Sequence, residues 1–408
     1  MLKRELYLHR IRPYYESDQI KVLTGVRRCG KSTLLQQIIQ EISEHVDAGH
    51  IIYINIEDFS YYKYYSNPEE FHLCIKQRMA DSKKYYIFID EIQHIDNFEL
   101  VVASLQATTN CSLFITGSNS TLLAGKLATR LTGRTKEYLI MPFTYKEMLD
   151  YFAQESRELP ADPLADYLLY GGIPIRFQNK SIRDTLDDLS AIYQSIIQKD
   201  IFPNIQDTYK TTFINFSTYT MSMSGTLISP KSLAGYISYY DTKISRPTIY
   251  SYLENLCNAY LVQKVDRFDI RGKKALVYLQ KFYAIDPGFI TINRNGGTND
   301  GLGGVLETVI YNELIARGYM VFIGKLPKGE IDFIVQHGQE RCYIQVANFM
   351  EQQETRNREF GAFDSVRDNF PKYVLSRDLE DYSHDGIIHL NVEKFLCGNV
   401  LSETSPSL

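Results

Sequence analysis

Residues 20–42 read IKVLTGVRRCGKSTLLQQIIQEI and contain the pattern G-x-x-x-x-G-K-[ST], which is filled by Gly25, Gly30, Lys31 and Ser32. A short apolar run precedes the pattern, and apolar residues recur at helical spacing after it. Strand, glycine-rich loop and helix in this order indicate a loop whose backbone N–H groups surround phosphate oxygens. The residues that we expect to bind ATP are Gly25, Val26, Arg27, Arg28, Cys29, Gly30, Lys31, Ser32 and Thr33. A plain glycine turn is the alternative.

Two of these residues have chemical roles that follow from their side chains. Lys31 would neutralise the charge of the β- and γ-phosphates, and Ser32 would offer its hydroxyl to Mg²⁺. A carboxylate is also needed to hold the metal, and KKYYIFIDEIQHI at residues 83–95 supplies one at the end of an apolar strand. We expect Asp90 to hold Mg²⁺ and Glu91 to orient and activate the attacking water. Taken alone, an apolar run followed by Asp-Glu is a common pattern.

A third apolar run, SLFITGSNS at residues 112–120, ends in small polar residues. Thr116, Ser118 and Asn119 are candidates to sense the γ-phosphate between the first two motifs, and a Ser/Asn-rich turn capping the next helix is the alternative. Farther along, Arg130 and Arg134 flank a glycine turn. Either arginine would stabilise developing charge on a neighbouring subunit's phosphate, or both form surface salt bridges.

Six segments together resemble one known family: TGVRRCGKSTLL, FIDEIQ, ITGSNS, LTGR, MPFTYKEML and YGGIPI. The chain is similar over nearly its whole length to the AAA-type P-loop ATPases of the AAA_14 family, whose members commonly carry a C-terminal DUF4143 region. The resemblance implies a P-loop core with an additional strand, Asp90 and Glu91 as the Walker B pair, and homo-oligomers whose ATP sites lie near subunit boundaries. It does not settle which arginine acts across the boundary.

The middle of the chain is predicted to be helical and then mixed. By analogy with the family, residues 151–210 form a helical lid, and residues 211–290 show the order of a winged helix-turn-helix: helix, helix, then two strands. Residues 263–283 hold six basic residues against two acidic ones, which suits DNA phosphate contacts. The candidate DNA-binding residues are Arg246, Lys264, Arg267, Arg271, Lys273 and Lys274. Packing against protein is the alternative use of such a module.

The C-terminal residues 301–400 resemble the PD-(D/E)xK nuclease fold, in the order helix, three strands, helix, strand. Glu307 matches the helix acid and Asp332 the strand acid, whereas YIQVA at residues 343–347 places Gln345 and Ala347 where an active enzyme carries E-x-K. Because Ala347 has no donor or base, we expect a catalytically dead domain. Lys325 or Lys328 would rescue the site if either reached it from another strand, and a plain buried strand is the alternative reading of YIQVA.

The composition limits the classes of protein to which the chain can belong. The chain has 408 residues, of which 44% are hydrophobic and 23% charged, and its formal net charge is −5. That charge produces no global field for nucleic acid, so DNA contact would need a local patch. No run of 18 apolar residues and no signal-peptide pattern occurs, so we expect a cytoplasmic protein without a membrane segment. The six cysteines are widely separated, which disfavours a metal site built on sulfur.

The sequence therefore predicts an α/β protein with four parts: a P-loop AAA-type ATPase core at residues 1–150, a helical lid at 151–210, a winged helix at 211–290 and a degenerate nuclease-like domain at 301–400. The expected function is that of a Mg²⁺-dependent ATP-hydrolysing motor or switch that forms homo-oligomers and engages DNA. The alternatives are an ATP-gated DNA endonuclease and a nucleotide-dependent regulatory protein that contacts a protein partner.

Overall fold

The computed structural model describes residues 2–118, 131, 133–228, 230–238, 244–270, 274–294, 302–327 and 329–398. Asn119, Arg130, Arg271, Lys273 and Lys328 lie outside the described residues, as does the side chain of Lys274. The chain forms two compact units, Met1–Met141 with Asn258–Tyr260, and Pro142–Cys257 with Leu261–Leu408.

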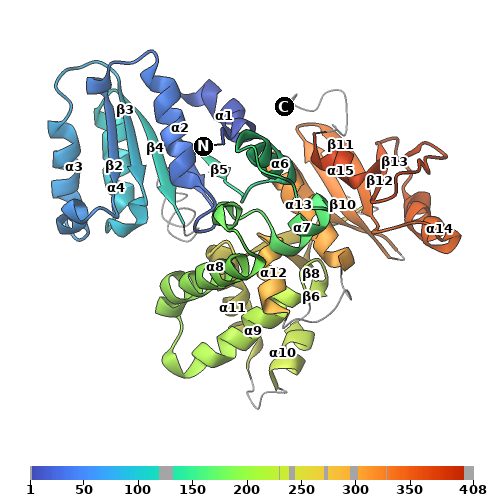
Figure 1. Cartoon of the computed structure of the whole chain (residues 1–408). Helices are drawn as coiled ribbons and strands as arrows, with labels where there is room; N and C mark the ends of the chain where they lie inside the picture. The colour runs from blue at the N-terminus through green and yellow to red at the C-terminus, as the bar shows by residue number, and fades with distance from the viewer. Residues whose placement is uncertain are drawn as a thin grey trace. The chain divides into compact units, whose positions relative to one another are not determined.

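Among the described residues, the first unit is built on five parallel strands in the order β2-β3-β4-β1-β5. The strands are β1 (Ile20–Thr24), β2 (Ile51–Asn55), β3 (Tyr85–Asp90), β4 (Cys111–Gly117) and β5 (Thr135–Leu139). The helices are α1 (Glu5–Ile11), α2 (Lys31–Ser43), α3 (Pro68–Gln77) and α4 (Phe98–Thr108). This arrangement confirms the predicted α/β core (Figure 1).

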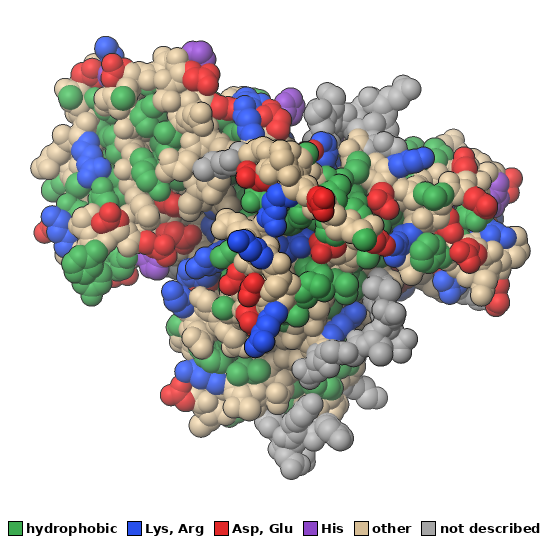
Figure 2. Space-filling model, in the orientation of Figure 1, with side chains coloured by type: hydrophobic (Ala, Val, Ile, Leu, Met, Phe, Trp, Pro, Cys, Tyr) green, Lys and Arg blue, Asp and Glu red, His purple; other side chains and the backbone are tan. Residues whose placement is uncertain are grey.

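The core of the first unit explains its apolar sequence runs. Every residue of β1, β3 and β4 is buried, as is usual for parallel strands that are covered on both faces. Apolar side chains of α3 and α4 pack with strand residues in one cluster that includes Phe71, Phe98 and Ile115. Acidic and basic side chains are interspersed over the face of this unit seen in Figure 2, in line with the modest net charge.

The second unit begins with helices and ends in a mixed sheet. Its helices are α6 (Tyr145–Gln154), α7 (Pro163–Tyr170), α8 (Ile182–Ile196), α9 (Lys210–Ser222), α10 (Pro230–Ser238), α11 (Arg246–Asn258), α12 (Pro287–Asn293), α13 (Leu302–Ala316), α14 (Gln353–Gly361) and α15 (Val392–Leu396). Its strands are β6 (Leu227–Ile228), β7 (Val262–Asp269), β8 (Lys274–Ala284), β9 (Met320–Lys325), β10 (Glu330–His337), β11 (Glu340–Val346), β12 (Lys372–Ser376) and β13 (Ile387–Asn391).

These eight strands form one sheet within the described residues, in the order β13-β12-β11-β10-β9-β7-β8-β6. Strands β7 and β8 make the predicted hairpin, and β6 pairs with β8. On the edge away from β8, β7 pairs in parallel with β9, and Arg267 lies opposite Ile323. The hairpin and the C-terminal strands therefore belong to one continuous sheet. The four domain limits given above stay predictions.

The YGGIPI segment turns where α7 ends, and its glycines are needed for a close approach. A Cβ at Gly171 would lie 1.8 Å from Asp286 Oδ1, and one at Gly172 would lie 1.9 Å from the Phe143 carbonyl oxygen. Asp286 is buried and accepts hydrogen bonds from the backbone N–H groups of Gly172 (2.7 Å) and Gly288 (2.8 Å). Burial raises its pKa to about 6.

No described helix is long and apolar enough to cross a membrane.

Candidate functional site

The loop between β1 and α2 turns through three residues with positive φ: Gly25 at 142°, Arg28 at 65° and Gly30 at 103°. A Cβ at Gly25 would lie 2.3 Å from the Ile140 carbonyl oxygen, so only glycine fits there. Helix α2 begins directly after Gly30. The first N–H groups of a helix lack partners within it and favour an anion, so this loop is a suitable phosphate site.

Lys31 lies inside this loop. Its side chain is buried, and Nζ donates to the carbonyl oxygens of Gly25 (3.0 Å) and Val26 (3.2 Å). Ser32 is exposed and Thr33 half-buried. Lys31 therefore holds an ammonium group against the loop that the sequence predicts to bind phosphate.

The acidic pair lies at the same edge of the sheet, because β1, β3 and β4 are parallel and their carboxyl ends meet there. Thr116, at the end of β4, lies between the other two strands in the sheet. Its hydroxyl donates to Asp90 Oδ1 and accepts a hydrogen bond from the backbone N–H of Glu91 (2.9 Å). Thr116 thus fixes both acidic residues, a placement that agrees with the prediction that it lies between the motifs.

Glu91 itself adopts a left-handed conformation, with φ at 56°. Such conformations cost energy in residues other than glycine and are common at functional sites. Its carboxylate accepts a hydrogen bond from Ser118 Oγ (3.2 Å) and another from Gln93 Nε2. The other amide atom, Gln93 Oε1, is buried and has no hydrogen-bond partner among the described residues. Ser118 and Gln93 therefore orient the Glu91 side chain.

Tyr53 and Gln93 contact the acidic pair and are not among the predicted site residues. Tyr53, on β2, donates from its hydroxyl to Asp90 Oδ2 at 3.4 Å. Burial and the neighbouring Asp90 raise the pKa of Tyr53, so this tyrosine stays protonated at neutral pH. The alternation of side chains along β2 does not reveal the Tyr53 contact. Gln93 lies two residues after Glu91, so its closeness to the acidic pair could have been inferred from the sequence.

These residues fit a magnesium-bound nucleoside triphosphate. The loop offers N–H groups and an ammonium group, and the acidic edge offers carboxylate oxygens, which Mg²⁺ prefers. The buried Gln93 Oε1 without a partner marks the same place as polar.

Arg134 lies at the other end of the sheet. It is exposed and directly precedes β5, and its carbonyl oxygen accepts from the N–H of Ile20 (2.8 Å), the first residue of β1. The five residues of β1 separate that point from the loop by about 16 Å along the strand. Arg134 is therefore remote from the phosphate loop of its own chain.

The five-stranded parallel sheet and its glycine-rich loop define a P-loop ATPase fold. A Walker-type ATPase of Pyrococcus abyssi has a similar solved structure, with a TM-score of 0.51 and 17% sequence identity, covering 72% of this chain and 96% of that one. Residues 17–149 match the AAA_14 family model, described as an AAA domain. The resemblance predicted for the N-terminal part is thereby confirmed.

The family is shown by a relative that is similar over nearly its full length. An uncharacterized protein of Haemophilus influenzae is 33% identical over 394 residues, covering 95% of this chain and 96% of the relative. The chain belongs to the family of that protein. An uncharacterized protein of Methanocaldococcus jannaschii is 28% identical and covers 92% of this chain and 85% of its own length. Residues 161–296 match a domain of unknown function, DUF8612. The DUF4143 resemblance stays a prediction.

The expected DNA-binding residues separate into two groups. Arg246 is exposed on α11, and Lys264 is exposed on β7. Arg267, however, is only 8% exposed, and its Nη2 lies 3.7 Å from Glu330 Oε2. The expectation that Arg267 contacts DNA is therefore wrong, because its side chain is buried and pairs with an acidic residue.

The predicted nuclease-like residues do lie near one another. Asp332 Oδ2 accepts from the N–H of Val346 (2.9 Å), and Gln345 Oε1 accepts from the N–H of Asp332 (3.3 Å). Ala347 is buried in an apolar cluster, and Lys325 is exposed on β9. The interactions described for Asp332, Gln345 and Ala347 thus include no contribution from Lys325.

A buried lysine does contact one of the predicted nuclease-like acids, Glu307, but this lysine comes from β8. Lys281 is buried, and its Nζ lies 2.9 Å from Glu307 Oε1 and 2.8 Å from Glu330 Oε1. Tyr283 also donates to Glu307 Oε1 at 2.5 Å. The sequence places Lys281 among the basic residues of the hairpin, and the apolar run that follows it, residues 282–285, was the available signal of burial.

Charge and burial oppose each other in this cluster. Burial alone would lower the pKa of Lys281, but Glu307, Asp332 and Glu330 outweigh it and raise that pKa. Burial, with repulsion from Glu307, raises the pKa of Asp332 well above its ordinary value. Burial also raises the pKa of Glu307, although Lys281 partly offsets this effect. The Lys281 ammonium group thus offsets the cost of burying the carboxylates around it.

Lys281→Met should reduce the free energy of unfolding by about 3–5 kcal/mol at pH 8, because it leaves buried carboxylates without their cation. The loss should be smaller at pH 5. A raised carboxyl pKa means that the folded state binds protons that the unfolded state releases, so stability falls as pH rises through that pKa. Urea denaturation at both pH values measures the difference. Lys264→Met, on the exposed face of β7, is the control, and an equal loss at both pH values would argue against this account.

Proposed function

We propose that this protein is a Mg²⁺-dependent ATP hydrolase that works as an AAA-type motor or switch in a homo-oligomer. The observation that supports it best is the hydrogen-bonded acidic edge: one hydroxyl, that of Thr116, holds Asp90 and the backbone of Glu91, while Ser118 holds the Glu91 carboxylate. A carboxylate oriented in this way beside a phosphate-binding loop suits activation of water for phosphoryl transfer.

Each residue has a role in this proposal. Loop N–H groups and the Lys31 ammonium bind the phosphates, and Ser32 and Asp90 would hold Mg²⁺, which when bound neutralises phosphate charge. Glu91 orients water and accepts its proton. Asn119 is proposed as a further sensor of the γ-phosphate and lies outside the described residues.

The position of Arg134 supports the proposed homo-oligomer. Because this arginine is exposed at the sheet edge remote from its own loop, the phosphate that it would reach belongs to a neighbouring subunit. Head-to-tail association of copies brings the two edges together and closes a ring when the rotation permits. An arginine acting across such a boundary stabilises transition-state charge. Arg130, outside the described residues, is the other candidate for this role.

Glu91→Gln and Arg134→Ala should each reduce ATP hydrolysis at least about a hundredfold, because one removes the base and the other the charge that stabilises transfer. When the two variants are mixed and exchange subunits, activity should return to on the order of a quarter of wild type, since some boundaries then pair an intact Glu91 with an intact Arg134. Phosphate release measures both effects.

The control for this mixing experiment is Glu91→Gln combined with the Glu91→Gln, Arg134→Ala double variant, which should stay inactive. Unchanged hydrolysis by Glu91→Gln would reject the role of Glu91. If both single variants fold and bind ATP but their mixture stays inactive, Arg134 does not act across a boundary.

DNA contact is a second candidate, favoured by the exposed face of α11. Arg246, Tyr250 and Ser251 are exposed there, and Ser245 Oγ accepts from the N–H of Thr248 (3.3 Å) at the start of the helix. Strand β6, helices α10 and α11, and strands β7 and β8 follow one another in the order of a winged helix. We propose that this helix contacts DNA, and that the C-terminal region is a nuclease-like module without cleavage activity, since Ala347 offers no base and Lys281 already binds Glu307.

Affinity for a short DNA duplex should fall on the order of tenfold to a hundredfold between about 50 and about 200 mM salt, because few phosphates are contacted. Arg246→Ala should weaken binding and flatten this dependence, whereas the exposed control Arg183→Ala on α8 should not. Fluorescence anisotropy measures the affinity. Undetectable binding at low salt favours a protein partner, and cleavage of plasmid in the presence of ATP and Mg²⁺ would support the endonuclease alternative.

A further inference from the structure

Arg4 is a fully buried arginine that reaches the phosphate loop from the start of the chain. It is 1% exposed, and its Nη1 donates to the carbonyl oxygens of Cys29 (3.0 Å) and Met141 (2.9 Å). The guanidinium lies over the ring of Tyr7, 4.6 Å from the centroid. One side chain therefore links the loop to the segment that follows β5.

The N-terminal segment also holds the backbone beside the loop, at Met141. The Tyr7 hydroxyl accepts from the N–H of Met141 (2.9 Å), so Met141 is fixed at its N–H and at its carbonyl. The preceding residue, Ile140, donates its N–H to the Thr24 carbonyl (2.8 Å), and its own carbonyl is the group that leaves no space for a Cβ at Gly25. Arg4 and Tyr7 thus position the backbone against which the loop begins.

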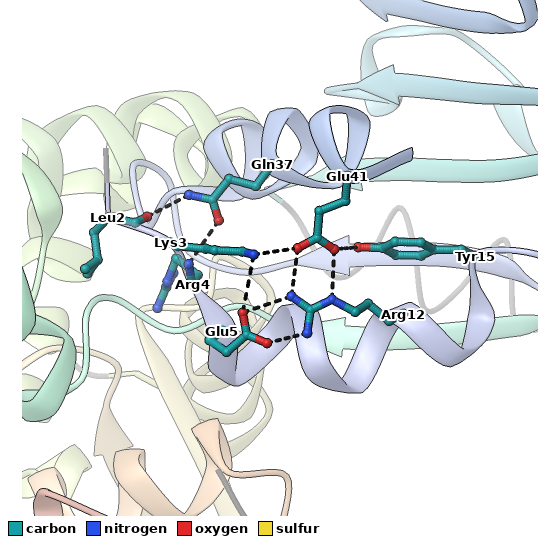
Figure 3. Close-up of polar contacts among 8 residues, drawn as sticks. All are labelled: Leu2, Lys3, Arg4, Glu5, Arg12, Tyr15, Gln37 and Glu41. Atoms are coloured by element: carbon teal, nitrogen blue, oxygen red, sulfur yellow. Dashed lines mark hydrogen bonds and ion pairs between the residues drawn. The ribbon is translucent and has the colours of Figure 1, made fainter. Parts of the chain in front are cut away.

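The segment is also attached to α2, the helix that starts at the loop. Gln37 accepts from the N–H of Arg4 (3.0 Å) and donates to the Leu2 carbonyl (2.6 Å). Farther along α2, Glu41 binds three side chains, as Figure 3 shows: Lys3 (2.9 Å), Arg12 (2.7 Å) and Tyr15 (2.9 Å). The Gln37 contacts fix where Arg4 lies, and the Glu41 contacts attach the rest of the N-terminal segment to the helix.

The consequence for the loop comes from peptide geometry. In a planar trans peptide the carbonyl and the next N–H point in opposite directions. Because Arg4 binds the Cys29 carbonyl, the N–H of Gly30 points away from Arg4. Without the guanidinium, the Cys29–Gly30 peptide would lose the contact that fixes its orientation.

We propose that Arg4 is a positioning residue for the nucleotide: it fixes the Cys29–Gly30 peptide so that the Gly30 N–H is directed toward the phosphates. This inference rests on the proposed ATP site. Arg4 touches no reacting atom in this scheme. Its effect therefore belongs to ATP binding, while hydrolysis depends on Asp90, Glu91 and Thr116 at the ends of β3 and β4.

Arg4→Met retains an unbranched side chain and removes every donor. It should raise the KM for ATP at least about tenfold and change kcat by less than about threefold, because an interaction common to the ground and transition states is lost. Arg4→Lys, which reaches the carbonyls with a single amine, should raise KM less. The matched control is Arg12→Met, which removes an arginine of the same segment from Glu5 and Glu41 but leaves Arg4 in place. It should lower the melting temperature and leave KM unchanged.

The outcomes separate the two claims. If the wild-type chain shows no ATP binding or hydrolysis, the proposed function and this inference both fail. If the wild type is active and a folded Arg4→Met or Arg4→Lys variant keeps the wild-type KM, the inference alone is overturned. Equal KM increases in Arg4→Met and Arg12→Met would also overturn it, because Arg4 would then act through general stability.

Discussion

The close approach of Gly25 to the carbonyl of Ile140 is the constraint around which the first unit is organised. A side chain at position 25 would collide with that carbonyl, so the chain can leave β1 and begin the loop here only as glycine. The loop then turns through Arg28 and Gly30 and delivers Lys31 to the start of α2. The sheet adds the second half of the site, since parallel strands bring Asp90 and Thr116 to the edge where the loop lies.

Buried cations are a recurring device in both units. Lys31 binds loop carbonyls, Arg4 binds the carbonyls of Cys29 and Met141, and Lys281 binds Glu307 and Glu330. An ammonium or guanidinium group is costly to bury unless its donors are satisfied, so each of these residues specifies one arrangement of the backbone or carboxylates around it. A count of charges along the sequence treats such residues as surface groups and overstates the basic character of the hairpin.

The features that the sequence predicts well each lie within one short run of consecutive residues. The loop, the apolar strand before Asp90 and the strand that ends near Thr116 are each contained in a short segment, so pattern and period suffice to place them. The same holds for the order of α10, α11, β7 and β8. Arg4 and Lys281 contact residues that are distant in the sequence. Strands β7 and β9 pair although other elements lie between them in the chain. No local period encodes such contacts, which is why Arg267 was taken for a surface residue.

The central claim is that the loop at residues 25–33 binds a nucleoside triphosphate. Titration calorimetry with a non-hydrolysable ATP analogue and Mg²⁺ tests it most directly, on the wild-type chain and on Lys31→Ala. The account predicts a saturable heat for wild type with about one nucleotide per chain, and an affinity at least about tenfold weaker for Lys31→Ala. No heat of binding from folded wild-type protein, or equal affinities for the two chains, would contradict it.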